Sequence, residues 1–301
     1  MRIVSFGSLN LDHVFEVDHF VAPGETLSPI AKNRYLGGKG FNQSLALARA
    51  GAEVYHAGKI GFDGVALADC LQQAGANIDN IIKDDDLETG QAIIQVAPTG
   101  QNCILLYGGA NQTISEEEID AVLERFGAGD MILLQNEISN MAYLMKKASS
   151  QGLEIVLNPS PCTQQLVQDY PLDLVDWFIL NEIEGAQLSG AADPESILDA
   201  LKLCYPKAHI VLTLGCVGCY YSYEDQRIFC PAHKVQVVDT TAAGDTFAGY
   251  FLSSIAFGRS AKCALEYGTA AAALAVQKRG AAPSIPSAFL AEAFMSEGPQ
   301  V

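Results

Sequence analysis

The chain has little positive charge and no long apolar run, and each absence excludes a class of protein. Its 301 residues include 18 Lys and Arg against 35 Asp and Glu, a formal net charge of −17 at pH 7. Such an acidic surface repels nucleic acid and anionic membranes, so we expect neither as a partner. No stretch approaches the ~20 apolar residues of a membrane span, and the apolar start is too short for a signal peptide. We therefore expect a cytoplasmic protein.

Two familiar nucleotide-binding motifs are also missing. The segment Leu36–Asn42 reads LGGKGFN, in which Gly40 follows the lysine where a P-loop needs Ser or Thr. No GxGxxG follows the first strand-like run, Ile3–Phe6, which argues against a dehydrogenase. The eight cysteines are dispersed through apolar segments, as expected of reduced thiols. The CxxC of Cys216 and Cys219 lacks both a second ligand pair and a thioredoxin-like setting.

What the sequence does contain is a regular alternation of strand-like and helical segments. Hydrophobic residues make up 49% and charged residues 18%, which suits a globular enzyme. Near-continuous apolar strands between helices are typical of a mostly parallel sheet with helices on both faces, an α/β fold. We predict strands at Ile3–Phe6, Val54–Ala57, Met131–Leu134, Leu153–Leu157, Trp177–Leu180, Ile210–Leu214 and Val235–Val238. Helices are expected near Phe41–Ala50, Gly64–Ala74, Ser115–Phe126, Asn140–Gln151, Glu182–Leu188, Glu195–Cys204 and Ala261–Val276.

Two stretches interrupt this alternation. Residues 14–35 hold Pro and Gly among short β-like pieces, and Gln91–Tyr107 reads as two strands around a Thr99-Gly100 turn. Together they could form a small separate sheet. Because both stretches flank candidate site residues, we interpret this sheet, residues 13–36 and 91–107, as a lid. We see no interdomain linker, so residues 1–301 are expected to form a single domain.

The segment Val235–Tyr250, VQVVDTTAAGDTFAGY, reads as a strand, a tight turn and a helix. The small residues at the turn, 242–244, let a ligand approach the backbone, and the first amides of a helix attract anions such as phosphate. Asp245 at this turn is placed to take a proton from a hydroxyl group that attacks the bound anion. Alternatively, Asp245 only caps the helix, since Asp is a favoured N-cap residue.

Polar motifs near other predicted strands each have a structural alternative. Asn10 and Asp12, two residues apart, point the same way along an extended backbone and suit neighbouring hydroxyl groups of a sugar. The structural alternative, a polar exit from a strand into a turn, is the commoner arrangement in general. The glycine-rich segment Leu36–Asn42 lets a ligand approach the backbone closely and adds Lys39 and Asn42 as polar contacts. Its alternative is a structural turn into a helix.

Two more motifs suit a nucleotide. Asn181 and Glu184 open a helix after the apolar run WFIL, and they could form a capping box. Alternatively, Glu184 holds Mg²⁺ through water beside a nucleotide's phosphates, because Mg²⁺ keeps several waters and needs few carboxylates. Thr213 ends another strand, and Gly215 and Gly218 after it leave room for a nucleotide against the backbone.

The order of these motifs resembles the ribokinase branch of the PfkB carbohydrate-kinase family. Along the chain it reads Asn-x-Asp, GGKGxN, Glu137 after the strand at Met131, NxxE, TLGxxG and DTxAAGD. The resemblance runs from about Ile3 to Pro286. It implies a ribokinase-like three-layer sandwich with a small β lid that commonly forms a dimer interface. It also implies transfer of the ATP γ-phosphoryl group to a primary hydroxyl of a pentose, with D-ribose the favoured substrate.

The resemblance assigns roles to residues. Asp245 would be the base, beside an anion hole made by the amides of Ala242, Ala243 and Gly244. The sugar would meet Asn10, Asp12, Gly38, Lys39, Asn42 and Glu137. The nucleotide would face Asn181, Thr213, Gly215, Gly218, Gly244 and Thr269, with Glu184 near Mg²⁺. A monovalent cation, usually K⁺, would lie behind the anion hole at Asp239, Thr241, Ala275, Lys278, Gly280 and Ser284.

Three positions depart from the ribokinase pattern. Phe41 stands where a small residue is usual, and it could shrink the sugar pocket or stack on a ring. Tyr107 takes a place often held by His. Thr269 lies where a larger polar residue often nears the adenine. The alternatives are therefore a kinase of another sugar or a nucleoside on the same fold and, more remotely, a non-catalytic sugar or nucleotide sensor.

Overall fold

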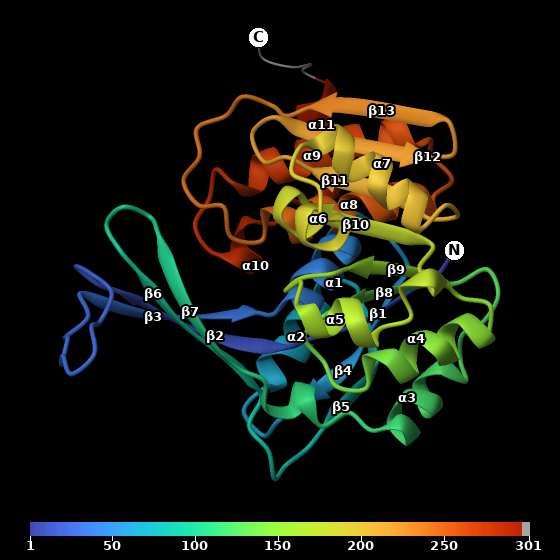
Figure 1. Ribbon diagram of the computed structural model, residues 1–301. Coiled ribbons are helices and arrows are strands. Elements are labelled where there is room, and N and C mark those ends of the chain that lie inside the picture. Colours follow the sequence, from blue (N-terminus) through green and yellow to red (C-terminus); the bar gives the residue numbers. More distant parts are fainter. Residues whose placement is uncertain (297–301) are drawn as a thin grey trace.

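The computed structural model describes residues 1–296, and its backbone forms a nine-stranded central sheet (Figure 1). The strands are β1 (Ile3–Phe6), β4 (Val54–Ile60), β5 (Asn77–Lys83), β8 (Met131–Gln135), β9 (Glu154–Asn158), β10 (Trp177–Asn181), β11 (His209–Thr213), β12 (Gly218–Tyr223) and β13 (Gln226–Pro231). Their order across the sheet is β13-β12-β11-β10-β9-β8-β1-β4-β5. All neighbours from β11 to β5 pair in parallel, whereas β12 and β13 add an antiparallel edge.

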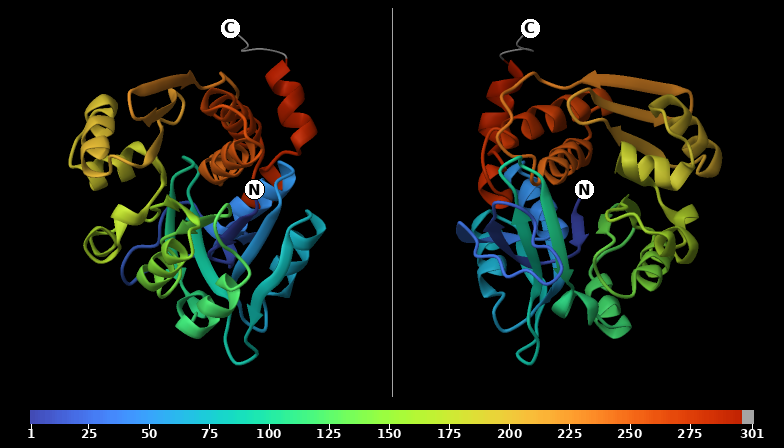
Figure 2. Two further views of the ribbon diagram at one scale, coloured as in Figure 1. Left: turned by 90° about the vertical axis from the view of Figure 1, so that its right-hand side faces the viewer. Right: turned by 60° about the vertical axis from the view of Figure 1, so that its left-hand side comes forward.

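Helices cover both faces of this sheet, which confirms the expected three-layer α/β sandwich (Figures 1 and 2). Because side chains alternate along a strand, Ile3 packs into one apolar core and Val4 into the other. The core of Ile3 is covered by α1 (Lys39–Arg49), α2 (Val65–Gln73), α8 (Ala243–Ala256), α9 (Ala261–Ala275), α10 (Ala281–Ser284) and α11 (Ala288–Ser296). The core of Val4 is covered by α3 (Glu116–Leu123), α4 (Met141–Ser150), α5 (Gln164–Asp169), α6 (Glu182–Ser189) and α7 (Pro194–Cys204). Within residues 1–296, no helix combines the length and apolar character needed to cross a membrane.

The two stretches that interrupt the alternation pair into a second sheet, which projects at the left of Figure 1. It has the order β3-β2-β6-β7, built from β2 (Asn10–Glu16), β3 (Ala31–Gly37), β6 (Gly90–Val96) and β7 (Asn102–Tyr107). The edge strand β7 is exposed along its whole length, including its apolar residues. The role of this sheet as a lid stays a prediction.

One predicted strand is wrong. Within residues 1–296, Val235–Val238 pairs with no strand, and it runs as irregular chain before α8. The Val238 amide donates instead to the carbonyl of Val276 at 2.8 Å, at the end of α9. A β-branched run has only a context-dependent preference for a strand, and this segment is held at the end of α9 instead. The hairpin of β12 and β13, which the sequence did not predict, forms the edge of the sheet.

The connectivity of the sheet determines where a ligand can bind. The chain moves outward from β1 through β4 and β5, and then returns to β8 on the other side of β1. Such a reversal opens a crevice at the carboxyl ends of the strands, the usual ligand site of open α/β sheets. Ser8 lies just after β1 and Glu137 just after β8, and the Ser8 hydroxyl donates a hydrogen bond to the Glu137 carboxylate.

Candidate active site

Asp245 lies in the first turn of α8, where amide side chains hold both of its carboxylate oxygens. Asn42 Nδ2 donates to Oδ2 at 3.0 Å, and Gln43 Nε2 donates to Oδ1 at 2.9 Å. Both donors are on α1, which packs closely on α8, since a Cβ at Gly249 would lie 2.4 Å from that of Ala46. In the part of the chain that the structure describes, the Asp245 side chain accepts no backbone amide at the helix start, whose N-cap is Ala242. The alternative that Asp245 only caps the helix is therefore wrong.

The turn before Asp245 provides backbone amides for an anion. Ala242 has a φ of 59°, and this left-handed residue turns the chain into α8. Within the described residues, the amides of Ala242 and Gly244 donate to no protein acceptor. The Ala243 amide differs from our expectation, because it donates to the carbonyl of Thr240 at 3.2 Å and so closes the tight turn. Two free amides next to an acidic side chain remain at the start of the helix.

Asn10 and Asp12 extend from β2 at the side of the crevice where a sugar is expected. Asn111 Nδ2 donates to Asn10 Oδ1 at 2.8 Å, which leaves the amide group of Asn10 free to donate to a ligand. The Asp12 carboxylate lies against Gly37, where a Cβ would come within 2.1 Å of Oδ2. Its other oxygen, Oδ1, is buried without a hydrogen-bond partner. An unsatisfied buried acceptor next to glycine backbone is suited to a ligand hydroxyl group.

Four acidic side chains and one lysine dominate the charge of the crevice. Burial and the charges of Glu137 and Asp245 raise the pKa of Asp12 to about 7. Burial also raises the pKa of Glu137, although Lys39 and Ser8 oppose this shift. Burial lowers the pKa of Lys39, but the carboxylates of Asp245, Glu137 and Glu184 outweigh it, so the net shift is upward. Lys39 therefore stays charged where negative groups converge.

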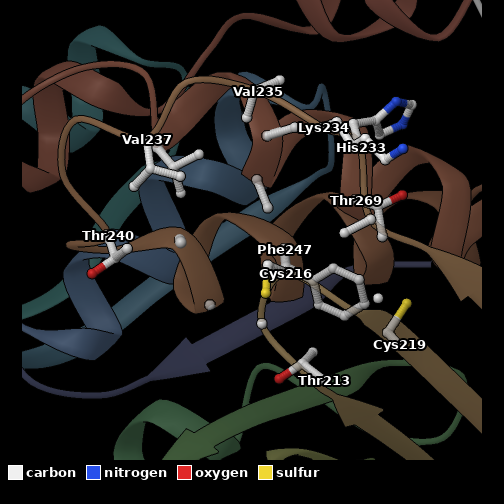
Figure 3. A pocket seen from close by; sticks show the side chains of 18 residues that line it. Thr213, Cys216, Cys219, His233, Lys234, Val235, Val237, Thr240, Phe247 and Thr269 are labelled. Carbon is white, nitrogen blue, oxygen red and sulfur yellow. The ribbon is translucent and has the colours of Figure 1, made fainter. Parts of the chain in front are cut away.

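Two adjoining cavities follow the crevice. The smaller has a volume of about 240 Å³ and is lined by Lys39, Asn181, Glu184, Gly244 and Asp245. The larger has a volume of about 490 Å³ and is mostly apolar. Figure 3 shows Val237, Phe247 and Thr269 among the side chains that line the larger cavity. The two cavities share Thr213, Thr240, Ala243 and Gly244 in their walls. A polar cavity opening into an apolar one suits a phosphate chain and a base.

The residues expected at the nucleotide have different parts in this wall. Gly215 and Gly218 line the larger cavity, and Gly218 has a φ of 138° and packs on Cys230, so no side chain fits there. Thr269 lines it too, but its hydroxyl donates to the Leu265 and Glu266 carbonyls of its own helix. Thr269 therefore shapes the cavity and has no free hydroxyl proton for an adenine.

Asn181 and Glu184 form the capping box that the sequence allows. The Asn181 side chain accepts the amides of Ile183 and Glu184, and Glu184 Oε2 accepts the Asn181 amide at 3.0 Å. Glu184 is buried and also lines the smaller cavity. The structural reading is thus confirmed, and it leaves one carboxylate oxygen of Glu184 for a magnesium-bound water. A single carboxylate beside a phosphate cavity fits the way Mg²⁺ is bound.

The positions expected around a monovalent cation come from two segments that the fold brings together. Asp239 Oδ2 accepts the Gly280 amide at 2.8 Å, and Asp239 Oδ1 accepts the amide and hydroxyl of Thr241. The Ala275 carbonyl accepts the Lys278 amide, and the buried Ser284 hydroxyl donates to Ala281. The donor set is rich in carboxylate, hydroxyl and carbonyl oxygens, which suits a hard cation.

Three side chains at the site escaped the sequence prediction. Gln43 contacts Asp245 directly, while Gln135 and Asn158 contact Gln43. Gln135 and Asn158 are the last residues of β8 and β9, each a polar residue that ends an apolar strand. The rule that ligands gather at the carboxyl ends of parallel strands could have found both.

The expectation for Phe41 is wrong. Its side chain is 0% exposed and belongs to the core beneath α1, with Leu9 and Leu45. The first turn of the helix aims residue 41 toward the sheet while Asn42 faces Asp245. Phe41 therefore cannot stack on a bound sugar. Tyr107 is exposed on β7.

An acid held beside free helix-start amides, between a polar crevice and an apolar cavity, suits an enzyme that transfers an anionic group to a hydroxyl. Proteins of similar sequence and structure are enzymes of this kind. Residues 1–288 match the family described as pfkB family carbohydrate kinase. A ribokinase of Haemophilus influenzae is 37% identical over 289 residues, which cover 93% of this chain and 94% of that protein.

Two solved structures have the same fold. Ribokinase from Cryptococcus neoformans var. grubii, in complex with ADP, has a TM-score of 0.85 and 34% identity, covering 97% of this chain and 99% of that one. Arabidopsis thaliana ribokinase, complexed with ribose and ATP, has a TM-score of 0.84 and 28% identity and covers 98% of both chains. The chain belongs to the pfkB family of carbohydrate kinases. It is an ATP-dependent sugar kinase with a ribokinase-like fold.

Proposed function

We propose that this kinase transfers the γ-phosphoryl group of ATP to the primary hydroxyl of a pentose, and that D-ribose, converted to ribose 5-phosphate, is its main substrate. One observation carries the proposal: Asp245 lies between the polar crevice of Asn10 and Asp12 and the free Gly244 amide. Carboxylate and amide groups suit the neighbouring hydroxyl groups of a free pentose. The Arabidopsis relative that was solved with ribose and ATP supports this choice.

Asp245 acts in this proposal as the general base. It accepts the proton of the sugar's primary hydroxyl, whose oxygen forms a bond to the γ-phosphorus while the bond to the β–γ bridging oxygen breaks and ADP leaves. The amides of Ala242 and Gly244 and the ammonium group of Lys39 stabilise the negative charge of the transferred group. Asn42 and Gln43 keep the carboxylate in place.

Two metal ions complete the proposal. Glu184 would hold Mg²⁺ through water, and this ion, when bound, neutralises charge on the ATP phosphates. Asp239, Thr241, Ala275, Lys278, Gly280 and Ser284 would surround K⁺. A cation there orders the loop that leads to the amides of the anion turn. Both assignments follow the family pattern, and the oxygen donors described above support them.

The direct test measures ATP consumption over a panel of pentoses, hexoses and nucleosides, with and without K⁺. We expect turnover to be highest with ribose and to rise with K⁺. Replacing Asp245 by Asn should reduce kcat by at least ~10²-fold and leave the fold and most ATP affinity intact. Asp85→Asn, in an exposed turn, is the control. If the enzyme prefers a nucleoside or another sugar, that compound replaces ribose in the proposal. If it phosphorylates none of the compounds, a non-catalytic sensor is favoured.

We also propose a homodimer formed through the small sheet, and a location in the cytoplasm. Strand β7 exposes three successive apolar side chains, Ile104, Leu105 and Leu106, and Leu105 is 68% exposed. A second copy could cover this edge. Sedimentation should report a dimer that Leu105→Glu converts to a monomer; a wild-type monomer would exclude the dimer.

The cysteines support the proposed location in the cytoplasm. All eight cysteines are free, which agrees with a reducing compartment.

A further inference from the structure

We propose that Gln43 is a positioning residue for the phosphoryl transfer: buried between Gln135 and Asn158, it sets the orientation of the Asp245 carboxylate. This inference rests on the role of Asp245 as the base, which is part of the proposed function. It assigns catalytic importance to three amide side chains that do not touch the reacting atoms.

The hydrogen bonds of Gln43 fix its own orientation. Its Nε2 donates to Asp245 Oδ1 at 2.9 Å and to Asn158 Oδ1 at 3.0 Å, so both amide protons are used. Its Oε1 accepts from Gln135 Nε2 at 2.7 Å. A flipped amide would place Oε1 against the Asp245 carboxylate and Nε2 against another donor. The three neighbours therefore permit one orientation.

These contacts connect Asp245 to the rigid sheet. Gln135 ends β8, and Asn158 ends β9. The Nδ2 of Asn158 donates in turn to the Ile179 carbonyl in β10 at 2.8 Å. Gln43, which is on α1, links the ends of β8 and β9 to Asp245 on α8. The position of the base therefore depends on three strands and two helices.

Burial makes this chain of amides difficult to replace. Gln43 is 0% exposed and Gln135 is 1% exposed, so water cannot take over a lost hydrogen bond there without a new cavity. With Asn42 on one carboxylate oxygen and Gln43 on the other, the plane of the Asp245 carboxylate is fixed. Asp245 also lines the smaller cavity, so the carboxylate held in this way borders the space where a substrate would bind. A base must be held in this way, because small displacements from the reactive geometry are costly in rate.

The first test replaces Gln43 by Met, which has a similar length but cannot donate a hydrogen bond. We expect kcat to fall by roughly 10- to 10²-fold while the KM values for sugar and ATP change by less than about threefold. Gln73→Met, on the exposed side of α2, is the matched control and should leave kcat unchanged. An unchanged kcat in Gln43→Met overturns the inference.

A structural role alone could also reduce kcat, so a double-mutant cycle separates the two. If Gln43 acts through Asp245, Gln43→Met should reduce kcat little or not at all once Asp245 is already Asn. An equal reduction in both backgrounds would mean that Gln43 only supports the fold. The Asp245→Asn variant itself tests the proposed function, because full turnover in this variant would refute the role of Asp245 as the base. If Asp245→Asn loses turnover as expected but Gln43→Met has no effect, only the inference about Gln43 is refuted.

A second variant, Gln43→Glu, tests the contact between residue 43 and Asp245 through the pH dependence of activity. It puts a second carboxyl group at hydrogen-bond distance from Asp245, and two such groups share a proton. The acid limb of the kcat profile, measured at saturating sugar so that Asp12 is already engaged, should move to higher pH by about one unit or more, with activity partly restored at alkaline pH. An unshifted profile would show that residue 43 does not contact the base in the working enzyme.

Discussion

The Gly280 amide donates a hydrogen bond of 2.8 Å to Asp239 Oδ2, and these residues are 41 positions apart in the chain. The contact joins the loop before α8 to the loop after α9. Burial raises the pKa of Asp239, but the hydrogen bonds from Thr241 and Gly280 and the charge of Arg279 outweigh it, so the net shift is downward. Asp239 is therefore anionic at neutral pH, beside the turn that presents the free amides.

Asp239→Asn should weaken activation by K⁺. Asparagine keeps an acceptor for Thr241, but it turns an amide donor toward the Gly280 amide and removes the charge that attracts a cation. We expect the K⁺ concentration for half-maximal activity to rise by about tenfold or more, and kcat at saturating K⁺ to fall several-fold. Titrating activity with KCl at constant ionic strength measures both. The exposed Asp85→Asn serves as control, and an unaltered K⁺ titration in Asp239→Asn would refute the cation assignment.

The Asp12 carboxyl should give the enzyme a pH-dependent affinity for its sugar. Its pKa is raised to about 7, and the ionised form is the better acceptor for sugar hydroxyl groups. Affinity should therefore increase as pH rises through about 7. Measured with limiting sugar, kcat/KM should increase from pH 6 to pH 8, and Asp12→Asn should lower it at pH 8 and flatten the rise. A rise of the same size in the variant would assign the titration to another group.

The same shift predicts an effect on stability, of opposite sign. The folded-state pKa of Asp12 lies above the value of 3.8 for the free side chain, so the folded protein binds the proton more tightly. Between pH 4 and 7 this contribution to stability is lost as pH rises, and the buried charge is a cost above about 7. Asp12→Asn should thus raise the Tm by roughly a few degrees at pH 8 and have little effect near pH 4. Calorimetry without sugar at both pH values measures this, and a lower Tm at pH 8 would contradict it.

Glu184 combines a structural contact with a proposed metal contact, and two variants separate them. Glu184→Gln keeps an acceptor for the Asn181 amide and should leave the Tm nearly unchanged, but it should raise the Mg²⁺ concentration needed for half-maximal activity several-fold. Glu184→Ala also breaks the capping box and should cost about 1 kcal/mol of stability. Thermal melts and Mg²⁺ titrations distinguish these effects. If Glu184→Gln and the wild-type enzyme need the same Mg²⁺ concentration for half-maximal activity, Glu184 has only its capping role.

Local patterns were enough to predict most of the sheet and part of the site. Apolar runs such as Ile3–Phe6 form buried parallel strands because both faces of the sheet are covered. The spacing of Asn10 and Asp12 follows from the period of an extended chain, and both indeed lie on β2. The pair Asn181 and Glu184 forms its capping box from four consecutive residues, so no tertiary information was needed.

Features that depend on distant parts of the chain were not predictable in this way. Gln43 looks like an ordinary polar helix residue, and it becomes a buried partner of Asp245, 202 positions away, only because Gly249 lets α8 approach α1 closely. The run Val235–Val238 has the composition of a strand, but its Val238 amide bonds to the end of α9 and the run is irregular. Its sequence gives it a preference for the extended conformation, but its tertiary contacts determine that it does not form a strand.

Phe41 offers the last test, because its position in GGKGFN suggested control of the sugar and its structure indicates a core role. The side chain is fully buried, and its amide donates to the Ser8 carbonyl at 2.9 Å. Phe41→Leu removes buried carbons beneath α1 and should cost about 1–2 kcal/mol of stability. The ratios of kcat/KM among ribose, deoxyribose and fructose should stay within about twofold of wild type, since no atom of residue 41 reaches the crevice. A changed sugar preference at unchanged Tm would instead place the side chain against the substrate.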